Sequence, residues 1–499
     1  MKISTSRIFQ FLFLAVFLLL FVTTDYRGKD EISVALNSFF RADPLVALSY
    51  LFSAKTFTIL LLPGLFVLVT SAFLGRFFCG WICPLGTLID LVTKRIPKGK
   101  PLPLLKGRLK YYLLFIILFA ALFSVNLAGI FDPIAILVRF LTFSFYPLFG
   151  YLAKAGWVGL YGLLGDWRDH LEPGYQLLKD YVLPFRDTFY PLALVSLLFL
   201  MAIIFLERFE RRNWCRNICP LGTLLGLVGR LSFLRRLPAR LCADCGDCTD
   251  HCPTSLDDGV FRKENCVLCL DCVRKCAQGR AAFRLRLPAR REPLFSPGRR
   301  VFVTGLVSGL FVSRMLGANL PTRETRLLRP PGVLKEEDFL KRCVRCGECM
   351  KVCLRSALYP ASLQAGIYGL YTPTIVPRLG YCEYNCNLCG QVCPTGAIPN
   401  LPLGVKKKAV IGCAVVDRNH CLPYARKMNC MVCEEHCPIP DKAIRFETVR
   451  ETDYDGKTVV LKRPYVVDDL CTGCGICEYV CPLEEKAGIE VYKKTKKRL

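Results

Sequence analysis

The sequence predicts a membrane α-helical bundle joined to small, cysteine-rich α+β domains. Two observations predict this fold class. Hydrophobic residues make up 53% of the 499 residues and the mean hydropathy is +0.34, which indicates that part of the chain lies in lipid. The 29 cysteines come in tight C-x2-C groups. Disulfide frameworks belong to short secreted chains, so we expect these thiols to bind metal instead.

Four apolar runs predict transmembrane helices. Each has 17 to 23 residues, close to the roughly 20 residues that a membrane-spanning helix needs. The runs cover residues 8–24, 56–78, 111–130 and 189–206. The first run has a signal peptide as its alternative, but no small-residue cleavage site follows it. We therefore expect a bundle of four transmembrane helices.

The charges of the loops predict the orientation of this bundle. Residues 84–110 carry seven Lys or Arg and one acidic residue, and residues 207–300 carry nineteen against ten. The loops at 25–55 and 131–190 are balanced, with four against four and five against six. By the positive-inside rule both basic stretches are cytoplasmic, in a multi-pass membrane protein. The apolar region 131–164 then enters and leaves the outer face as interfacial or re-entrant helices.

A fifth apolar run at residues 301–320 follows four arginines and contains Arg314 near its far end. The same charge rule predicts a fifth transmembrane helix that runs outward. Threonine, serine and three glycines lower the hydrophobicity of this run, so a buried or peripheral helix is the alternative. If the run spans the membrane, residues 321–499 lie outside the cytoplasm.

The net charge of +26 raises nucleic-acid binding as an alternative function. The basic excess lies mainly in loops that flank lipid, so membrane orientation accounts for it and we expect no nucleic-acid partner. The chain has only four histidines and no C-x-x-C-H motif, so we also expect no haem.

An internal repeat carries four thiols. Cys79-Gly-Trp-Ile-Cys83-Pro-Leu-Gly-Thr-Leu recurs 136 residues later as Cys215-Arg-Asn-Ile-Cys219-Pro-Leu-Gly-Thr-Leu. We interpret this as a duplicated helical hairpin in which four cysteines converge, with a helix break at each proline. The four thiols are candidate metal or cluster ligands or redox-active dithiols. The alternative is that cysteine packs a tight turn.

The residues after Cys242 have the spacing of a bacterial two-cluster ferredoxin. Three cysteines at x2 spacing and a fourth after x3 occur twice, and in this pattern the fourth cysteine binds the other cluster. One 4Fe–4S cluster is therefore expected on Cys242, Cys245, Cys248 and Cys276, and a second on Cys252, Cys266, Cys269 and Cys272. The alternative, zinc, expects two C-x2-C pairs separated by a longer loop.

Four further cysteine quartets follow, and they predict four more clusters. The quartets are Cys343, Cys346, Cys349 and Cys353; Cys382, Cys386, Cys389 and Cys393; Cys421, Cys430, Cys433 and Cys437; and Cys471, Cys474, Cys477 and Cys481. Spacing does not decide which quartets exchange their fourth cysteine. The predicted total is six 4Fe–4S clusters. The predicted domains are a transmembrane bundle at 1–235, a two-cluster ferredoxin domain at 236–298, a fifth helix and linker at 299–325, and a four-cluster polyferredoxin at 326–499.

At these motifs the chain resembles two known families. The duplicated C-x3-C-P helices with the Cys242–Cys276 ferredoxin resemble NapH, the membrane quinol dehydrogenase component of periplasmic nitrate reductase systems. Residues from about 299 onward resemble NapG and MauM, through Pro330-Pro331-Gly332, Cys343-Val-Arg-Cys346-Gly-Glu-Cys349 and Cys471-Thr-Gly-Cys474-Gly-Ile-Cys477. The chain therefore looks like a NapH–NapG fusion, with Arg299-Arg300 resembling the remnant of a twin-arginine signal.

The resemblance implies that the bundle lies in the bacterial inner membrane and oxidises quinol from the membrane pool. Electrons would pass through the clusters to a periplasmic reductase, such as nitrate reductase, or to its cytochrome, with the first ferredoxin domain cytoplasmic and the second external. Quinol must also release protons, and Asp132 is our candidate acceptor, with His170 behind it. The alternative for Asp132 is a helix-end residue exposed to lipid headgroups. The alternative function is a membrane polyferredoxin that supplies electrons for maturation or regulation of a metalloenzyme.

Overall fold

The computed structural model contains two compact units, which are described separately below. It describes residues 5–28, 30–32, 35–93, 109–164, 168–237, 252–254, 256–257, 260–261, 263–276, 281–285, 298–318, 326–333, 335–452 and 456–494. The first unit is formed by Met1–Thr24, Val34–Ala318 and Leu340–Cys346, and the second by Asp25–Ser33, Asn319–Phe339 and Gly347–Leu499. A short segment of the cysteine-rich half, Leu340–Cys346, thus belongs to the first unit.

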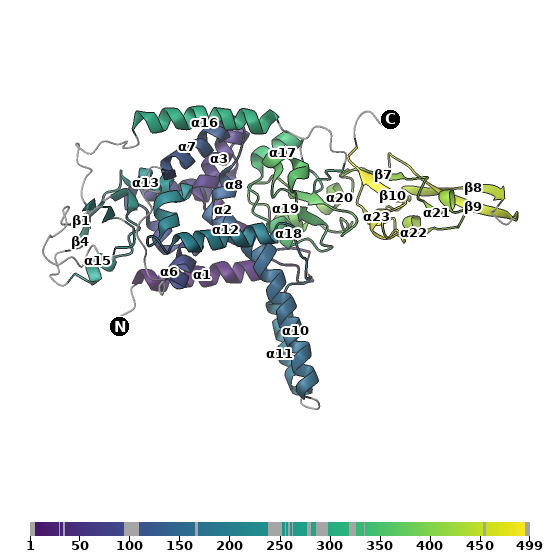
Figure 1. Ribbon diagram of the computed structural model, residues 1–499, viewed down its shortest axis with the longest axis horizontal. Helices are drawn as coiled ribbons and strands as arrows, with labels where there is room; N and C mark the ends of the chain where they lie inside the picture. The colour runs from purple at the N-terminus through teal and green to yellow at the C-terminus, as the bar shows by residue number, and fades with distance from the viewer. Residues whose placement is uncertain are drawn as a thin grey trace. The chain divides into compact units, whose positions relative to one another are not determined.

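The first unit is mainly helical (Figure 1). Its helices up to the second repeat are α1 (Thr5–Thr23), α2 (Asn37–Arg41), α3 (Pro44–Ala54), η1 (Ile59–Leu61), α4 (Leu62–Leu74), α5 (Phe77–Trp81), α6 (Pro84–Thr93), α7 (Leu109–Leu122), α8 (Ala128–Phe131), α9 (Pro133–Phe140), η3 (Leu141–Phe145), α10 (Tyr146–Leu164), α11 (Arg168–Tyr181) and α12 (Ala193–Leu206). The remaining helices are η5 (Trp214–Ile218), α13 (Pro220–Gly229), η6 (Lys263–Asn265), α15 (Asp271–Arg274) and α16 (Arg299–Ala318). Two antiparallel strand pairs join β1 (Leu234–Leu237) to β4 (Ala282–Leu285) and β2 (Leu256–Asp257) to β3 (Val260–Phe261).

Helices α7 and α16 pack against each other in parallel. A Cβ added to Gly305 would lie 2.6 Å from Cβ of Phe115, and one added to Gly309 would lie 2.7 Å from Cβ of Phe119. From the first contact to the second, the residue number rises by four on both helices, so the two helices run in the same direction. Glycine at these two positions lets the helix backbones approach closely, as small residues do in helix pairs.

The prediction of four transmembrane helices is not supported. Among the described residues, two helical stretches are long and apolar enough to span a membrane, Thr5–Thr23 and Pro133–Leu163. The first coincides with a predicted span, whereas the second falls where interfacial or re-entrant helices were expected. The other three predicted runs contain helices of only 13 or 14 residues.

Backbone breaks shorten two of these three helices. Helix α4 ends at Gly75 (φ +89°), and the chain after α7 turns at Ser124 (φ +69°). A hydropathy count does not register a change of backbone conformation inside an apolar run. The fifth run does form one continuous helix, α16, but α16 is not among the two stretches that meet the length and composition test.

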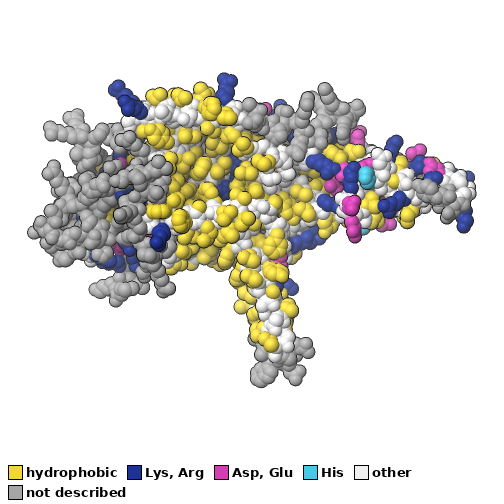
Figure 2. All heavy atoms as spheres, in the orientation of Figure 1, with side chains coloured by type: hydrophobic (Ala, Val, Ile, Leu, Met, Phe, Trp, Pro, Cys, Tyr) yellow, Lys and Arg dark blue, Asp and Glu magenta, His cyan; other side chains and the backbone are white. Residues whose placement is uncertain are grey.

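Large apolar side chains remain exposed on several helices of the first unit. Leu19 on α1, Phe66 on α4 and Leu194 on α12 are 62%, 67% and 63% exposed. Figure 2 shows hydrophobic side chains over much of the visible described surface of this unit. Exposed apolar area on this scale is unusual for a soluble monomer.

The second unit combines short helices with two-stranded antiparallel sheets. Its helices are α18 (Glu348–Lys351), η7 (Leu363–Ala365), η8 (Ile367–Gly369), α19 (Leu388–Gln391), α20 (Leu403–Lys406), α21 (Leu422–Ala425), α22 (Val432–Glu435) and α23 (Ile476–Tyr479), and α17 (Glu336–Arg342) crosses the boundary between the units. The strand pairs are β5 (Leu358–Pro360) with β6 (Pro373–Ile375), β7 (Cys413–Val416) with β10 (Ile489–Tyr492), and β8 (Ile444–Thr452) with β9 (Thr458–Val466). These elements agree with the predicted α+β, ferredoxin-type domains.

Candidate iron–sulfur and proton sites

The cysteine motifs share one local structure. In five of them the third cysteine lies on a one-turn helix and the fourth follows that helix. The helices are α15, α18, α19, α22 and α23, and they carry Cys272, Cys349, Cys389, Cys433 and Cys477. The fourth cysteine often accepts a backbone hydrogen bond at sulfur, such as the 3.3 Å bond from Gly488 N–H to Cys481 Sγ. Such bonds tune the potential of an iron–sulfur cluster.

One cavity in the second unit is lined by four cysteines from two different quartets. Cys421, Cys430 and Cys433 come from one motif, and Cys481 is the last cysteine of the next. The rest of the lining is mainly apolar and includes Pro464. The structure therefore groups the first three cysteines of one quartet with the fourth of the other.

Neighbouring thiols elsewhere follow the same exchange. Cys353, the last of its quartet, lies close enough to Cys382 and Cys389 to act on them electrostatically. Cys437 acts in the same way on Cys474. These electrostatic interactions agree with the exchange of fourth cysteines that the cavity at Cys421 and Cys481 shows.

The structure also brings together one of the two sets predicted for the first ferredoxin domain. Cys266 lies near Cys252, Cys269 and Cys272. Of the other predicted set, Cys276 is described, whereas Cys242, Cys245 and Cys248 lie outside the described residues.

The chemistry of these thiols fits an iron–sulfur core. Burial raises the pKa of Cys382, Cys421 and Cys433 to about 12, so four neighbouring thiolates are stable only beside a positive group. A 4Fe–4S core supplies that charge and takes four cysteine ligands. Among the described residues no three Cys, His, Asp or Glu side chains are close enough to hold a single metal ion.

The repeated C-x3-C-P motifs form a thiol site that is separate from the cysteine quartets. Helix α6 begins at Pro84 and α13 at Pro220, which confirms the predicted helix breaks. All four cysteines of the repeat are buried, with 4 to 7% of their surface exposed. Thiols of the two copies act on each other electrostatically, so the predicted convergence of Cys79, Cys83, Cys215 and Cys219 is present in the structure.

Two buried arginines cross between the copies of the repeat. Arg76 and Arg212 are each 2% exposed and occupy equivalent positions, three residues before the first cysteine of each motif. Nη2 of Arg76 donates a 2.5 Å hydrogen bond to the carbonyl oxygen of Cys215, and Nη1 of Arg212 donates a 3.2 Å bond to that of Cys79. Each arginine thus binds the backbone of the other copy and adds positive charge beside the thiols.

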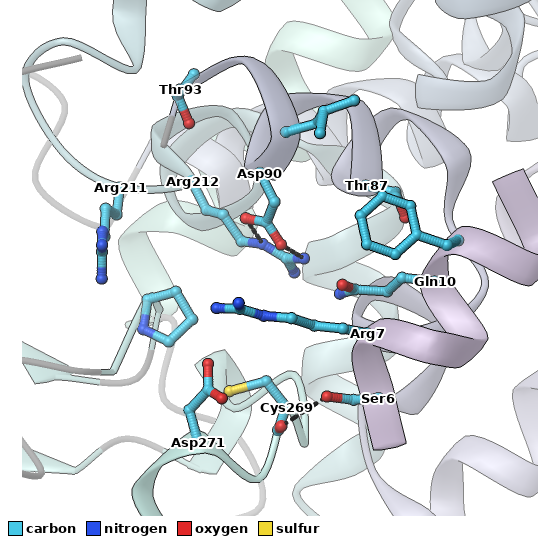
Figure 3. Close-up of a pocket in the computed structure, with 13 residues that line it drawn as sticks. Ser6, Arg7, Gln10, Thr87, Asp90, Thr93, Arg211, Arg212, Cys269 and Asp271 are labelled. Carbon is cyan, nitrogen blue, oxygen red and sulfur yellow. Dashed lines mark hydrogen bonds and ion pairs between the residues drawn. The ribbon is translucent and has the colours of Figure 1, made fainter. Parts of the chain in front are cut away.

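A cavity of about 200 Å³ lies beside this thiol site (Figure 3). Asp90 on α6 receives two hydrogen bonds from Arg212, at 3.0 and 2.6 Å, at one side of the cavity. Figure 3 shows Arg7 of α1 reaching between this pair and Cys269 with Asp271. The cavity is therefore lined by the Asp90–Arg212 pair of the repeat on one side and by Cys269 and Asp271 of the first ferredoxin domain on the other.

Two cysteine loops pack on glycines of the first unit in the same manner. A Cβ added to Gly80 would lie 1.9 Å from the carbonyl oxygen of Val267, and one added to Gly129 would lie 1.7 Å from that of Val344. Both valines belong to a Cys-Val-x-Cys sequence, at Cys266–Cys269 and Cys343–Cys346. Only glycine permits either approach.

Asp132 is fully buried, so the alternative of a headgroup-exposed helix end is wrong. It is paired with a second fully buried carboxyl group, Asp43, which the sequence analysis missed. Each aspartate precedes a proline and caps a helix, α3 after Asp43 and α9 after Asp132. The repeated Asp-Pro pair was the available signal. The side chain of His170 lies outside the described residues.

Comparison with known protein families identifies iron–sulfur domains in both halves of the chain. A model described as a 4Fe-4S binding domain matches residues 56–110 and again 189–238, the two copies of the repeat. A model described as a 4Fe-4S dicluster domain matches residues 342–397 and 428–484.

Several relatives are ferredoxin-type proteins. The methylamine utilization ferredoxin-type protein MauM of Methylorubrum extorquens is 38% identical over 205 residues, which cover 38% of this chain and 88% of MauM. The ferredoxin-type protein NapG of Escherichia coli is 38% identical over 161 residues, covering 32% of this chain and 68% of NapG. The putative electron transport protein YccM of Escherichia coli is 29% identical over 237 residues, covering 46% and 57%. No solved structure matches the chain.

Proposed function

Because the chain belongs to the family of NapG and MauM ferredoxin-type proteins, we propose that it oxidises membrane quinol and delivers the electrons to a periplasmic reductase. The chain is an iron–sulfur electron-transfer protein of the ferredoxin type. The first half would take the role of a NapH-type quinol dehydrogenase in the bacterial inner membrane. The second half would carry electrons toward nitrate reductase or its cytochrome.

The observation that carries this proposal is the matched packing of two cysteine loops on the helical unit. The Val267 and Val344 carbonyls both lie against glycines of that unit. A redox group at either loop would therefore lie directly beside the helices. This arrangement favours electron exchange between the helical unit and the groups held at both loops.

The proposal includes six 4Fe–4S clusters held by the 24 cysteines of the six quartets, and a ligand or redox role for the four repeat thiols. The clusters would supply one-electron redox chemistry at potentials set by burial and hydrogen bonds to sulfur. The exposed apolar helices would anchor the chain in the membrane, where quinol is dissolved. Oxidation of one quinol releases two electrons and two protons, and Asp132 is the proposed proton acceptor.

Reduction by a quinol analogue tests this function. Purified chain with its iron content established is mixed with duroquinol in nanodiscs, and cluster absorbance is followed over time. Rapid bleaching is expected, and dithionite defines full reduction. Reduction by a soluble ferredoxin but not by duroquinol would instead support a role in metalloenzyme maturation.

A further inference from the structure

The buried carboxyl groups of Asp43 and Asp132 each have one oxygen atom that receives no hydrogen bond. Oδ1 of Asp43 accepts hydrogen bonds from Leu45 N–H at 2.7 Å and Val46 N–H at 3.2 Å, and Oδ2 of Asp132 accepts one from Ala135 N–H at 2.8 Å. The other two oxygens, Asp43 Oδ2 and Asp132 Oδ1, are buried and have no hydrogen-bond partner when both groups are treated as acceptors. Each carboxyl group nevertheless lies within hydrogen-bonding reach of the other.

A shared proton resolves this deficit. An ionised carboxylate only accepts hydrogen bonds, whereas a protonated one also donates. Two carboxylates in contact in a buried place do not both ionise. Burial and the facing Asp132 raise the pKa of Asp43 well above its usual value. One proton on Asp43 therefore gives Asp132 its missing donor.

The charges around the pair favour this distribution. Arg139 on α9 is buried and lowers the cost of a negative charge on Asp132. Its guanidinium donates to the carbonyl oxygens of Gly129 at 2.7 Å and Ile130 at 2.8 Å, which holds it in place. Arg41, two residues before Asp43, is a second cation on the neighbouring helix α2, and its Nε is buried. Because Arg139 acts on Asp132, whereas the facing Asp132, in addition to burial, raises the pKa of Asp43, Asp132 is the charged, proton-accepting member.

The pair is connected to a cysteine loop by one short segment, residues 126–132. The N–H of Asp132 donates to the carbonyl oxygen of Ala128 at 2.9 Å. Val344 O contacts Gly129, and Nη1 of Arg345 donates a 2.6 Å bond to the carbonyl oxygen of Asn126. These contacts are all inside the first unit. This segment therefore carries the proton acceptor Asp132 and also contacts the loop that bears Cys343 and Cys346.

We propose that Asp43 and Asp132 share one proton and together accept the protons that quinol releases at this end of the first unit. The inference rests on the proposed function. As each electron leaves toward the iron–sulfur group that Cys343 and Cys346 would help to hold, one quinol O–H bond breaks and an O–H bond forms on Asp132. The pair passes this proton to water before the second proton arrives. Two protons and two electrons are then accounted for per quinol.

Infrared spectroscopy of the full chain tests the shared proton without turnover. The wild-type chain at neutral pH is expected to show the C=O band of a buried protonated carboxylic acid, sensitive to deuterium exchange. Asp43→Asn is expected to lose this band. Asp180→Asn, on the exposed surface of α11, is the matched control and should retain it. A wild-type chain without the band would overturn the shared-proton pair whatever the kinetics give.

Stopped-flow reduction by duroquinol tests the proton-accepting role. A general base typically contributes at least about 100-fold to a proton-transfer step, and we expect Asp132→Asn, which removes the accepting carboxylate, to slow reduction by that factor. Reduction by dithionite should not change. The wild-type rate should rise with pH as Asp132 ionises, and Asp132→Asn should lose this rise.

The two proposals fail in different ways. If duroquinol reduces the wild-type chain and Asp132→Asn equally fast, the pair has no role in accepting the protons and quinol oxidation stands. If duroquinol does not reduce the wild-type chain, quinol oxidation and the proton-accepting role are both refuted, while the infrared band still decides whether the pair shares a proton.

Discussion

The grouping of Cys421, Cys430 and Cys433 with Cys481 leads to a prediction about iron content. If fourth cysteines exchange between quartets, Cys421 and Cys481 bind the same cluster, whereas Cys421 and Cys437 bind two different clusters. Replacing Cys421 by alanine should remove one cluster, or about four of about 24 irons. Adding Cys481→Ala should remove no more iron, but adding Cys437→Ala should remove about four more.

The assay is iron and acid-labile sulfide per chain for the single variant and the two double variants. Alanine is used because serine oxygen can replace a thiolate as ligand. Comparison with the single variant controls for collapse of the second unit, which would release the iron of all four of its clusters at once. The reverse result, with extra loss on Cys481→Ala and none on Cys437→Ala, would mean that each quartet binds its own cluster and that the cavity grouping does not reflect ligation.

Three further predictions concern packing, charge and hydrogen bonding. Gly129→Ala places a methyl group 1.7 Å from a carbonyl oxygen and should destabilise the chain by about 1–3 kcal/mol in thermal unfolding, whereas Gly156→Ala meets nothing within 4 Å and should not destabilise it. Arg212→Gln removes a buried positive charge beside the repeat thiols and should lower the reduction potential of any group they hold, measured by spectroelectrochemical titration; an unchanged potential would argue against a redox group there. The thiol of Cys413 donates to Oδ1 of Asp468 at 3.2 Å and lies beside Cys471, whose pKa it lowers, so Cys413→Ala should lower the potential of one cluster; a potential that stays the same or rises would mean that Cys413 does not stabilise the Cys471 thiolate.

The sequence predicted the local cysteine loops well because their geometry depends on nearby residues. The x2 and x3 spacings place the third cysteine on a one-turn helix in motif after motif. The exchange that brings Cys481 to Cys421 depends on tertiary packing, which spacing does not encode. Helix lengths were overestimated for a related reason, since the turns at Gly75 and Ser124 interrupt runs that remain apolar in composition.

The sequence singled out one of the two aspartates of the proton site, Asp132, but not the other. Asp132 stood out as an isolated acidic residue at the end of an apolar run, and the structure gives it a buried place. Asp43 lay in a loop with balanced charge and attracted no attention. Its relation to Asp132 is visible in the sequence only as a second Asp-Pro pair. Recognising that the two pairs meet requires the packing of α3 on α8 and of α2 on α9 in three dimensions.

The crossed arginines show why the duplicated motif forms one site. Arg76 binds the Cys215 carbonyl, and Arg212 binds the Cys79 carbonyl. A single copy would bury a guanidinium without its acceptor, and an unpaired buried charge is strongly destabilising. Duplication therefore supplies each copy with the partner for its own arginine. It also collects four thiols and two positive charges in one place, which one hairpin could not do.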